Sequence, residues 1–352
     1  MKNRFLFLTL ALLFIWQCTK APSLKKWAPY NETEELAQNA INKNPRLRYK
    51  RIQSKHTDKN SLFIPFENEL IQFESSYARL NPFILERSIP ELQSAVASGL
   101  FSYEELTLFY LYRIYRYETD PTLYLNAILA LNPDVVQEAR EKDLDQKQAE
   151  EFPLYGMPIL LKDNINTANM PTTAGAAVFK NNQTKEDAYI VNQLKKHGAL
   201  ILGKLNLSEW AYYFCEGCPL GYSALGGQTL NPYGRKVFES GGSSSGSGVA
   251  AGANYAVATV GTETSGSILS PAAKNALFGL KPTIGAVSRS GIIPISSTFD
   301  TAGPMTKKVV DNLLIFNALI GYDKNDPYSY AAKPLDVSAL DMASLKESAL
   351  EW

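Results

Sequence analysis

The chain has 352 residues, of which 45% are hydrophobic and 20% are charged. This is the composition of a globular protein that is long enough to bury a large core. Its 35 basic and 35 acidic residues cancel, so no net positive charge favours counterion release, and nucleic acid is not expected as a partner.

The first 17 residues have the pattern of an export signal. Two basic residues precede a mostly apolar run of 12 residues at 5–16, which is shorter than a membrane-spanning helix requires. The next residues resemble a bacterial lipobox, in which Cys18 would carry lipid as the first mature residue, although Gln17 stands where a small residue is usual. We therefore expect a membrane-held lipoprotein facing the periplasm or the cell surface. Plain secretion and an uncleaved anchor are the alternatives.

Residues 18–87 are expected to form a polar tether between the lipid-anchor site and the folded domain. The segment is irregular and includes a basic run at 45–60, which is typical of a solvated spacer. Apolar residues return at 61–73, so part of the segment can pack on the surface of the domain. The domain itself is predicted to span residues 88–352.

From residue 88 onward the sequence has the start and stop signals of regular elements. Pro90 suits the first turn of a helix that Gly99 ends, and Ser102 and Glu105 form the capping box of a second helix. Apolar runs then alternate with helical patterns, which is typical of an α/β domain. Strands are predicted within 156–164, 198–206 and 255–263, and further helices near 134–143, 187–197, 208–214 and 307–320.

Two stretches rich in serine and glycine, at 241–248 and 261–268, lie on either side of an apolar, strand-like segment. Their hydroxyl and backbone N–H groups would meet in one buried place; a flexible linker is the alternative. A Ser-His-Asp hydrolase is disfavoured, because the only histidines are His56 in the polar tether and His197 at the end of a charged helix. A reactive serine here would need a different base.

Lys162 is a candidate for that base because it ends the apolar run at 158–161. Burial disfavours the charged ammonium group and can lower the pKa of a lysine by about 3–5 from its usual value near 10.4. The resulting neutral amine could accept a proton from a serine. The alternative is a lysine whose amine extends to the surface at the end of a strand.

Six sequence blocks follow one another over about residues 88–320: GMPILLKDNINT, GALILGKLNLSEWA, GGSSSGSGVAAGA, GTETSGSILSPAA, GLKPTIGAVSRSGIIPIS and DTAGPM. In this order they resemble the amidase signature family of hydrolases. Two of them, with GTETSGSI and SRSGIIPIS, are more similar to bacterial peptide amidases than to amidotransferase subunits, which usually read GTDTGGSIR. The resemblance implies an α/β/α sandwich around a mixed β-sheet.

The resemblance also implies a Ser-Ser-Lys triad. Ser267 would be the nucleophile, Ser243, after a cis peptide bond, would relay its proton, and neutral Lys162 would be the final base. The implied reaction is hydrolysis of a carboxamide, for example the C-terminal amide of a peptide, by water through an acyl-enzyme, with no metal or cofactor. The oxyanion would be held by the backbone N–H groups of Thr264, Ser265, Gly266 and Ser267.

Cys215 and Cys218 form a C-x-x-C pair. A structural zinc site would need four ligands, and neither a second C-x-x-C nor a histidine lies nearby. Two alternatives remain: a local disulfide, which export would permit, and two inert thiols. The resemblance places this loop near the substrate, so a disulfide here could shape specificity.

The resemblance breaks off after the helix predicted at 307–320. Family members continue with further strands and helices, so the domain at 88–352 is expected to be incomplete at its C-terminus. This leaves a non-catalytic surface lipoprotein as an alternative to an active amidase. An amidotransferase A-type subunit is a further alternative, disfavoured by the export signal and by GTETSGSIL.

Overall fold

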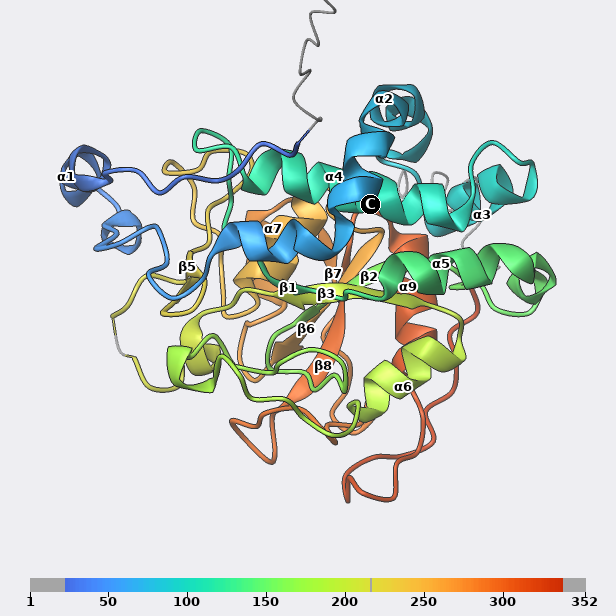
Figure 1. Ribbon diagram of the computed structural model, residues 1–352. Helices are drawn as coiled ribbons and strands as arrows, with labels where there is room; N and C mark the ends of the chain where they lie inside the picture. The colour runs from blue at the N-terminus through green and yellow to red at the C-terminus, as the bar shows by residue number, and fades with distance from the viewer. Residues whose placement is uncertain (1–22, 216, 338–352) are drawn as a thin grey trace, which may run out of the picture.

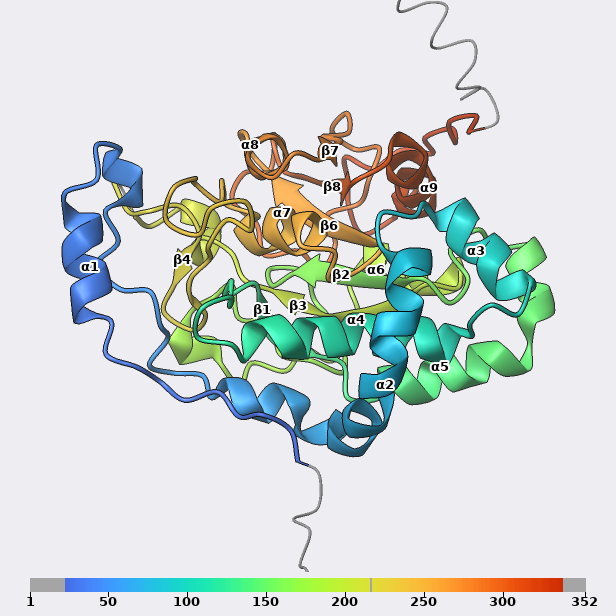
Figure 2. The ribbon, with the colours of Figure 1, turned by 90° about the horizontal axis from the view of Figure 1, so that it is seen from above.

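The structure, a computed structural model, describes residues 23–215 and 217–337. The predicted signal peptide and the lipidation site at Cys18 lie outside the described residues. Within them the chain forms a mixed six-stranded β-sheet with helices on both faces (Figures 1 and 2). The predicted α/β fold, with layers of helices around a mixed sheet, is confirmed.

The strands of the large sheet lie in the order β1-β3-β2-β6-β8-β7. Strand β2 pairs in parallel with β3 and β6, whereas β1, β8 and β7 are antiparallel to their neighbours. The strands β4 and β5 form a separate small sheet. The bounds are β1 (Ile128–Leu131), β2 (Pro158–Lys162), β3 (Leu200–Leu205), β4 (Tyr222–Ser223), β5 (Gly227–Gln228), β6 (Ala258–Glu263), β7 (Phe278–Gly279) and β8 (Thr301–Thr306).

The helices pack in groups around this sheet. Helix α4 contacts α2 and α5, α6 contacts α9, and α7 lies against β2, β6 and β8. None of the helices in the described part of the chain combines the length and the apolar character needed to span a bilayer. Their bounds are α1 (Thr33–Ala40), α2 (Glu67–Ile84), α3 (Ile89–Ala97), α4 (Tyr103–Glu118), α5 (Val135–Leu144), α6 (Tyr189–Lys196), α7 (Ser245–Gly252), α8 (Leu269–Lys274) and α9 (Val309–Leu319).

The central strands β2 and β3 are buried along their whole length. A strand that is covered on both faces reads as a continuous apolar run, which is why the sequence predicts both of them. In the parallel pair of β2 and β6, Leu161 lies opposite Val260, so the two strands end at the same edge of the sheet. Lys162 and Glu263 are their last residues, and the serine-rich loops lie at this edge.

The capping box predicted at Ser102 is confirmed, and the structure adds a second one at Ser88. One predicted helix is wrong. The hydroxyls of Ser88 and Ser102 each accept a hydrogen bond from the backbone N–H three residues later. The residue at that position is a glutamate, whose carboxylate accepts a hydrogen bond from the backbone N–H of the serine. Helices α3 and α4 begin at these two capping boxes. Near 208–214 the structure has only a short 3₁₀ turn at Glu209–Tyr212. Trp210 there has a φ of 51°, a left-handed conformation that a right-handed helix does not continue.

The tether predicted for residues 18–87 is wrong where the structure describes it. Helix α2 lies in this segment, and apolar residues recur along it at spacings of three and four residues. The opposite face of α2 is polar, so the average composition of the segment is polar as well. This average concealed the helical periodicity of the apolar residues. Trp27 and Leu47 also join the main hydrophobic core, so the described part of this segment belongs to the packed domain. The buried residues of α2 are Leu70, Phe73, Tyr77, Leu80 and Ile84.

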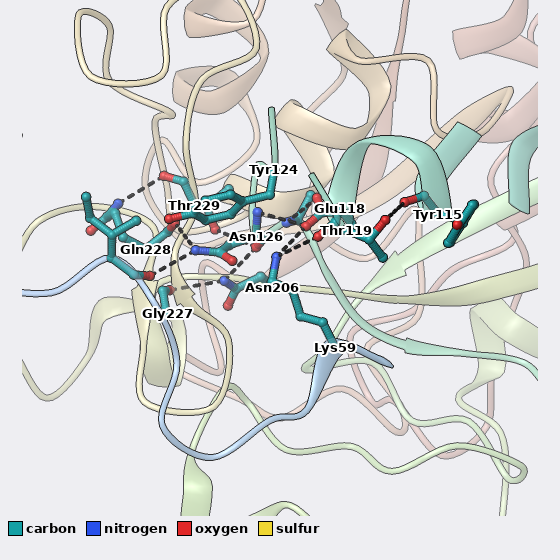
Figure 3. Close-up of polar contacts among 12 residues, drawn as sticks. Lys59, Tyr115, Glu118, Thr119, Tyr124, Asn126, Asn206, Gly227, Gln228 and Thr229 are labelled. Carbon is teal, nitrogen blue, oxygen red and sulfur yellow. Dashed lines mark hydrogen bonds and ion pairs between the residues drawn. The ribbon is translucent and has the colours of Figure 1, made fainter. Parts of the chain in front are cut away.

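Polar contacts fasten this N-terminal segment to the rest of the domain (Figure 3). Lys59 Nζ lies 2.8 Å from Glu118 Oε2, at the end of α4, and both side chains are largely buried. The Asn126 side-chain amide donates to the carbonyl oxygens of Ile52 and Gln228, each at 2.9 Å. Because these bonds lie away from solvent, they hold the N-terminal segment beside β1 and β5 more firmly than surface contacts would.

Candidate active site

Lys162 is fully buried at the end of β2. Its Nζ lies 2.9 Å from Ser243 Oγ, 2.8 Å from Thr262 Oγ1 and 3.3 Å from the carbonyl oxygen of Thr262. The Thr262 hydroxyl is in turn held by Asn164 Nδ2 at 3.0 Å. The amine of Lys162 therefore has neutral hydrogen-bond partners.

The pKa of Lys162 is lowered from 10.5 to about 7 because the charged ammonium group loses its hydration on burial. The carboxylates of Asp300 and Glu263 act in the opposite direction, but they do not offset the effect of burial. Near pH 7 a large fraction of Lys162 is therefore a neutral amine, which can accept a proton.

Two serines continue the chain of hydrogen bonds from Lys162. Ser243 Oγ lies 3.1 Å from Ser267 Oγ, and the peptide bond between Gly242 and Ser243 is cis, as the family resemblance implies. Ser243 is buried, whereas Ser267 is partly exposed. The structure thus brings the three predicted side chains together, with the most accessible hydroxyl at one end and the buried amine at the other.

The serine turn at 241–246 is shaped by close backbone packing. Gly241 has a φ of 70°, and a Cβ there would lie 2.6 Å from Pro271 Cα, so only glycine fits. The Ser243 carbonyl oxygen accepts a hydrogen bond from Ser208 N at 3.0 Å, and Ser244 N donates to the carbonyl oxygen of Ser267 at 3.2 Å. The second of these bonds connects the two serine-rich stretches directly, and the first ties the serine turn to the segment after β3.

The predicted oxyanion site is corrected at one residue. Gly266 N already donates to Glu263 Oε1 at 2.8 Å, so it is not a donor to substrate in this arrangement. Within the described residues, the backbone N–H groups of Thr264, Ser265 and Ser267 have no hydrogen-bond acceptor in the protein. These three residues line the cavity beside the Ser267 hydroxyl, where their free N–H groups can bind an oxyanion.

Glu263 fixes the shape of this loop, a role that the sequence did not reveal. Its other carboxylate oxygen accepts hydrogen bonds from Ile268 N at 2.7 Å and Leu269 N at 2.9 Å, at the start of α8. Gly266 has a φ of 78°, and a Cβ there would meet no atom within 4 Å. Glycine is therefore required here by the left-handed backbone and not by lack of space.

Ser267 and Ser243 open into a cavity of about 440 Å³. A neighbouring cavity of about 300 Å³ shares Ala211, Thr264 and Ile295 with it, so two spaces flank the oxyanion loop. The residues that line the larger cavity are Ala211, Tyr212, Tyr213, Leu220, Gly242, Ser243, Thr264, Ser265, Gly266, Ser267, Ser270 and Ile295.

The loop that contains Cys215 and Cys218 borders this cavity. Cys215 and Cys218 are joined by a disulfide, with their Cα atoms 5.8 Å apart. Tyr212 lines the cavity and donates through its hydroxyl to the carbonyl oxygen of Cys218 at 2.7 Å. Among the described residues, no group of three or more His, Cys, Asp or Glu side chains is arranged to hold a metal ion.

Lys204 is a second buried lysine, which was not predicted to be buried. Like Lys162, it lies in a mostly apolar run that forms a strand. Lys204 lies within the apolar strand β3 and is fully buried, and its Nζ is 3.0 Å from Asp163 Oδ1. It also donates to Thr172 Oγ1 at 3.0 Å and to the carbonyl oxygen of Pro171 at 3.1 Å. Lys204 thus has a carboxylate partner, whereas the amine of Lys162 has none among the described residues.

The match to the family model for amidases covers residues 105–349. A putative amidase of Schizosaccharomyces pombe (strain 972 / ATCC 24843) is 40% identical over 248 residues, which are 69% of this chain and 41% of that protein. The A-type subunit of the glutamyl-tRNA(Gln) amidotransferase of Thermobifida fusca (strain YX) is 38% identical over 275 residues, which are 75% of this chain and 53% of that protein.

Solved structures give the same result. An amidase family protein from Bacillus anthracis str. Ames matches with a TM-score of 0.76 and 41% identity, over 81% of this chain and 58% of that chain. The peptide amidase from Stenotrophomonas maltophilia matches with a TM-score of 0.68 and 45% identity, over 72% of this chain and 52% of that chain. The chain spans about half the length of the relatives that it matches. Sequence and fold together show that it belongs to the amidase family.

Proposed function

We propose that this protein is an amidase that hydrolyses the C–N bond of a carboxamide, with Ser267 as nucleophile, Ser243 as proton relay and Lys162 as base. The observation that carries the proposal is the pair of hydrogen bonds from Ser267 Oγ through Ser243 Oγ to Lys162 Nζ. The pKa of Lys162, lowered by burial to about 7, matches the task of a base near neutral pH.

In the first step, Ser267 Oγ forms a bond to the amide carbon. Its proton passes to Ser243 Oγ while the Ser243 proton passes to Lys162 Nζ, so the relay serine ends with the hydroxyl it began with. The carbonyl electron pair moves onto oxygen, and the negative charge that develops is held by free backbone N–H groups in the loop at 264–267.

In the second step, the ammonium group of Lys162 returns its proton through Ser243 to the amide nitrogen. The C–N bond breaks, ammonia leaves from a primary amide, and an ester to Ser267 remains. Water then attacks this ester while its proton follows the same path. The carboxylic acid is released, and all three side chains regain their starting protonation states.

A peptide C-terminal amide is the substrate class that we favour. The similarity to the peptide amidase of Stenotrophomonas maltophilia supports it, and a cavity of about 440 Å³ lies beside Ser267. The similarity to the A-type amidotransferase subunit of Thermobifida fusca supports a second candidate, in which the amide nitrogen comes from glutamine. The sequence GTETSGSIL at 261–269 favours the first candidate over the second.

Ammonia release from the purified protein distinguishes these candidates. We expect release from a peptide with a C-terminal amide, none from the same peptide as a free acid, and little from glutamine. Release from glutamine alone would instead favour the amidotransferase. No release from any amide, with a protein shown to be folded, would leave the non-catalytic lipoprotein as the better interpretation.

The pH dependence of the same assay tests the role of Lys162. Because the protonated amine cannot act as a base, kcat/KM should rise about tenfold per pH unit below the midpoint and level off above it. The midpoint is expected near the Lys162 pKa of about 7. A rate that is independent of pH between 5 and 9 would contradict this role.

We also propose that the protein is exported and held on a membrane by lipid at Cys18. The apolar run at 5–16 and the lipobox-like residues that follow support this. Labelled palmitate is expected to enter the protein in cells and to be absent from the Cys18→Ala variant. Equal labelling of both proteins, or of neither, would rule out lipidation at Cys18.

A further inference from the structure

We propose that Asn206 is a positioning residue for Ser243, and that a buried polar network ending at Lys59 holds Asn206 in place (Figure 3). The proposal rests on the relay role proposed for Ser243. It assigns a part in the reaction to a side chain that contacts neither the Ser243 hydroxyl nor the amine of Lys162.

Asn206 directly follows β3 and is fully buried. Its carbonyl oxygen accepts a hydrogen bond from Gly246 N, in the first turn of α7, at 2.8 Å, and two residues later Ser208 N donates to the Ser243 carbonyl oxygen at 3.0 Å. The segment at 206–208 therefore holds both ends of the turn that presents the Ser243 hydroxyl. A Cβ on Gly246 would lie 2.3 Å from the Asn206 carbonyl oxygen, so the contact is close.

The Asn206 side chain uses its full hydrogen-bonding capacity to fix this segment. Its Nδ2 donates to the carbonyl oxygens of Asn126 at 2.9 Å and Gly227 at 3.2 Å. Its Oδ1 accepts from Leu207 N at 2.9 Å and from Ser223 Oγ at 2.7 Å. Two donors and two acceptors are thus satisfied, which fixes the orientation of the amide as well as its position.

A second layer of contacts fixes the partners of Asn206 (Figure 3). Glu118 is buried, and its carboxylate accepts hydrogen bonds from Asn126 N at 3.1 Å and Ala127 N at 3.2 Å. Lys59 Nζ lies 2.8 Å from the same carboxylate and compensates its charge. The Ala127 carbonyl oxygen accepts from Asn206 N at 2.8 Å. The network therefore runs without a gap from the N-terminal segment to the serine turn.

The geometry at Ser243 explains why this support affects the reaction. The two relay bonds are 2.9 Å and 3.1 Å long, so a displacement of the turn by about 1 Å can lengthen one of them beyond hydrogen-bonding distance or misalign both. Loss of alignment of this size can reduce a rate by about 10²-fold. Substrate binding depends on the cavity walls and is expected to change little.

The test compares Asn206→Ala with Asn132→Ala in the full-length protein. Asn132 is also an almost fully buried asparagine, and it contacts the other end of β3. Its backbone N donates to the Leu202 carbonyl oxygen, and its side-chain amide donates to the Ile201 carbonyl oxygen. Both variants lose buried hydrogen bonds, and both should melt a few degrees lower than the wild type. Only Asn206→Ala should lower kcat, by about 10²-fold with KM within about threefold.

Hydrogen–deuterium exchange provides a readout that does not depend on catalysis. The segment at 241–250 should exchange faster in Asn206→Ala and at the wild-type rate in Asn132→Ala. Equal kcat in the two variants, or unchanged exchange at 241–250 in Asn206→Ala, would overturn the proposal. If the wild type itself releases no ammonia, the proposed function fails instead, and the exchange result still decides whether Asn206 holds the turn.

Ser223→Ala keeps the proposal testable if Asn206→Ala does not fold. The Ser223 hydroxyl donates to Asn206 Oδ1 and accepts from Gly226 N at 2.9 Å, so its removal is a smaller change. We expect kcat to fall by a factor of about 3–10. This factor corresponds to the free energy of one buried hydrogen bond, if its loss disturbs the position of Ser243. A wild-type kcat in Ser223→Ala would count against the network.

Discussion

The Ser267→Ala variant is expected to lose at least about 10³-fold in kcat for amide hydrolysis and all covalent labelling by a fluorophosphonate. Ser267 is the exposed end of the relay, and its Oγ is the atom from which the proton path to Ser243 and Lys162 begins. Alanine leaves the loop backbone and its free N–H groups in place, so the loss would measure the nucleophile itself.

Two controls make this result specific. Because Ser267 is partly exposed, its replacement should change the free energy of unfolding by less than about 1 kcal/mol. Ser98 is exposed at the end of α3. Among the described residues, its hydroxyl makes a local hydrogen bond to the Ala95 carbonyl oxygen. Ser98→Ala should therefore retain full labelling. Labelling of Ser267→Ala at the wild-type rate would show that a different residue is the nucleophile.

The central strands β2 and β3 could be predicted because they are buried, mostly apolar runs. The lysine that ends 158–162 stands out against that apolar run, and the parallel pairing of β2 with β6 brings it to the serine-rich loops. The cis peptide bond before Ser243 was predicted from the family resemblance alone. No periodicity in the residues themselves indicates such a bond.

Helix α7 was not predicted, because its glycines read as a loop. The helix consists entirely of Ser, Gly, Ala and Val, and glycine has a low helix propensity. A Cβ on Gly248 would lie 2.8 Å from Pro271 Cβ, and one on Gly246 would meet Asn206. The small residues thus reflect close packing against segments distant in sequence, and local propensity does not contain that information.

The oxyanion loop shows a second limit of the sequence. The resemblance gives four neighbouring N–H groups as donors, but it does not show that the Glu263 carboxylate turns back and takes the one on Gly266. That contact depends on the side-chain conformation at the end of β6. Likewise, Lys162 and Lys204 have the same signal in the sequence, and only the structure separates them by their partners.

The Lys162→Met variant is expected to lose at least about 10³-fold in kcat without losing stability. Its lowered pKa corresponds to a cost of up to about 5 kcal/mol for burying the charged form. The three hydrogen bonds that its amine makes contribute about 1 kcal/mol each. The cost of burying the charge thus exceeds the gain from the three hydrogen bonds. An apolar side chain of similar length should therefore leave the melting temperature unchanged or raise it.

Lys204→Met is the matched comparison, and the opposite result is expected. Removal of the Lys204 amine leaves the buried carboxylate of Asp163 without its cation, and breaking such a pair costs about 3–5 kcal/mol. Selection for stability alone would not retain a buried amine without a carboxylate partner, so Lys162 calls for a functional explanation. The Lys204–Asp163 ion pair is explained by its contribution to the fold. Comparison of kcat and melting temperature for the two variants therefore tests whether Lys162 is kept for catalysis. A Lys162→Met variant with kcat within tenfold of the wild type, or destabilised as much as Lys204→Met, would show that it is not.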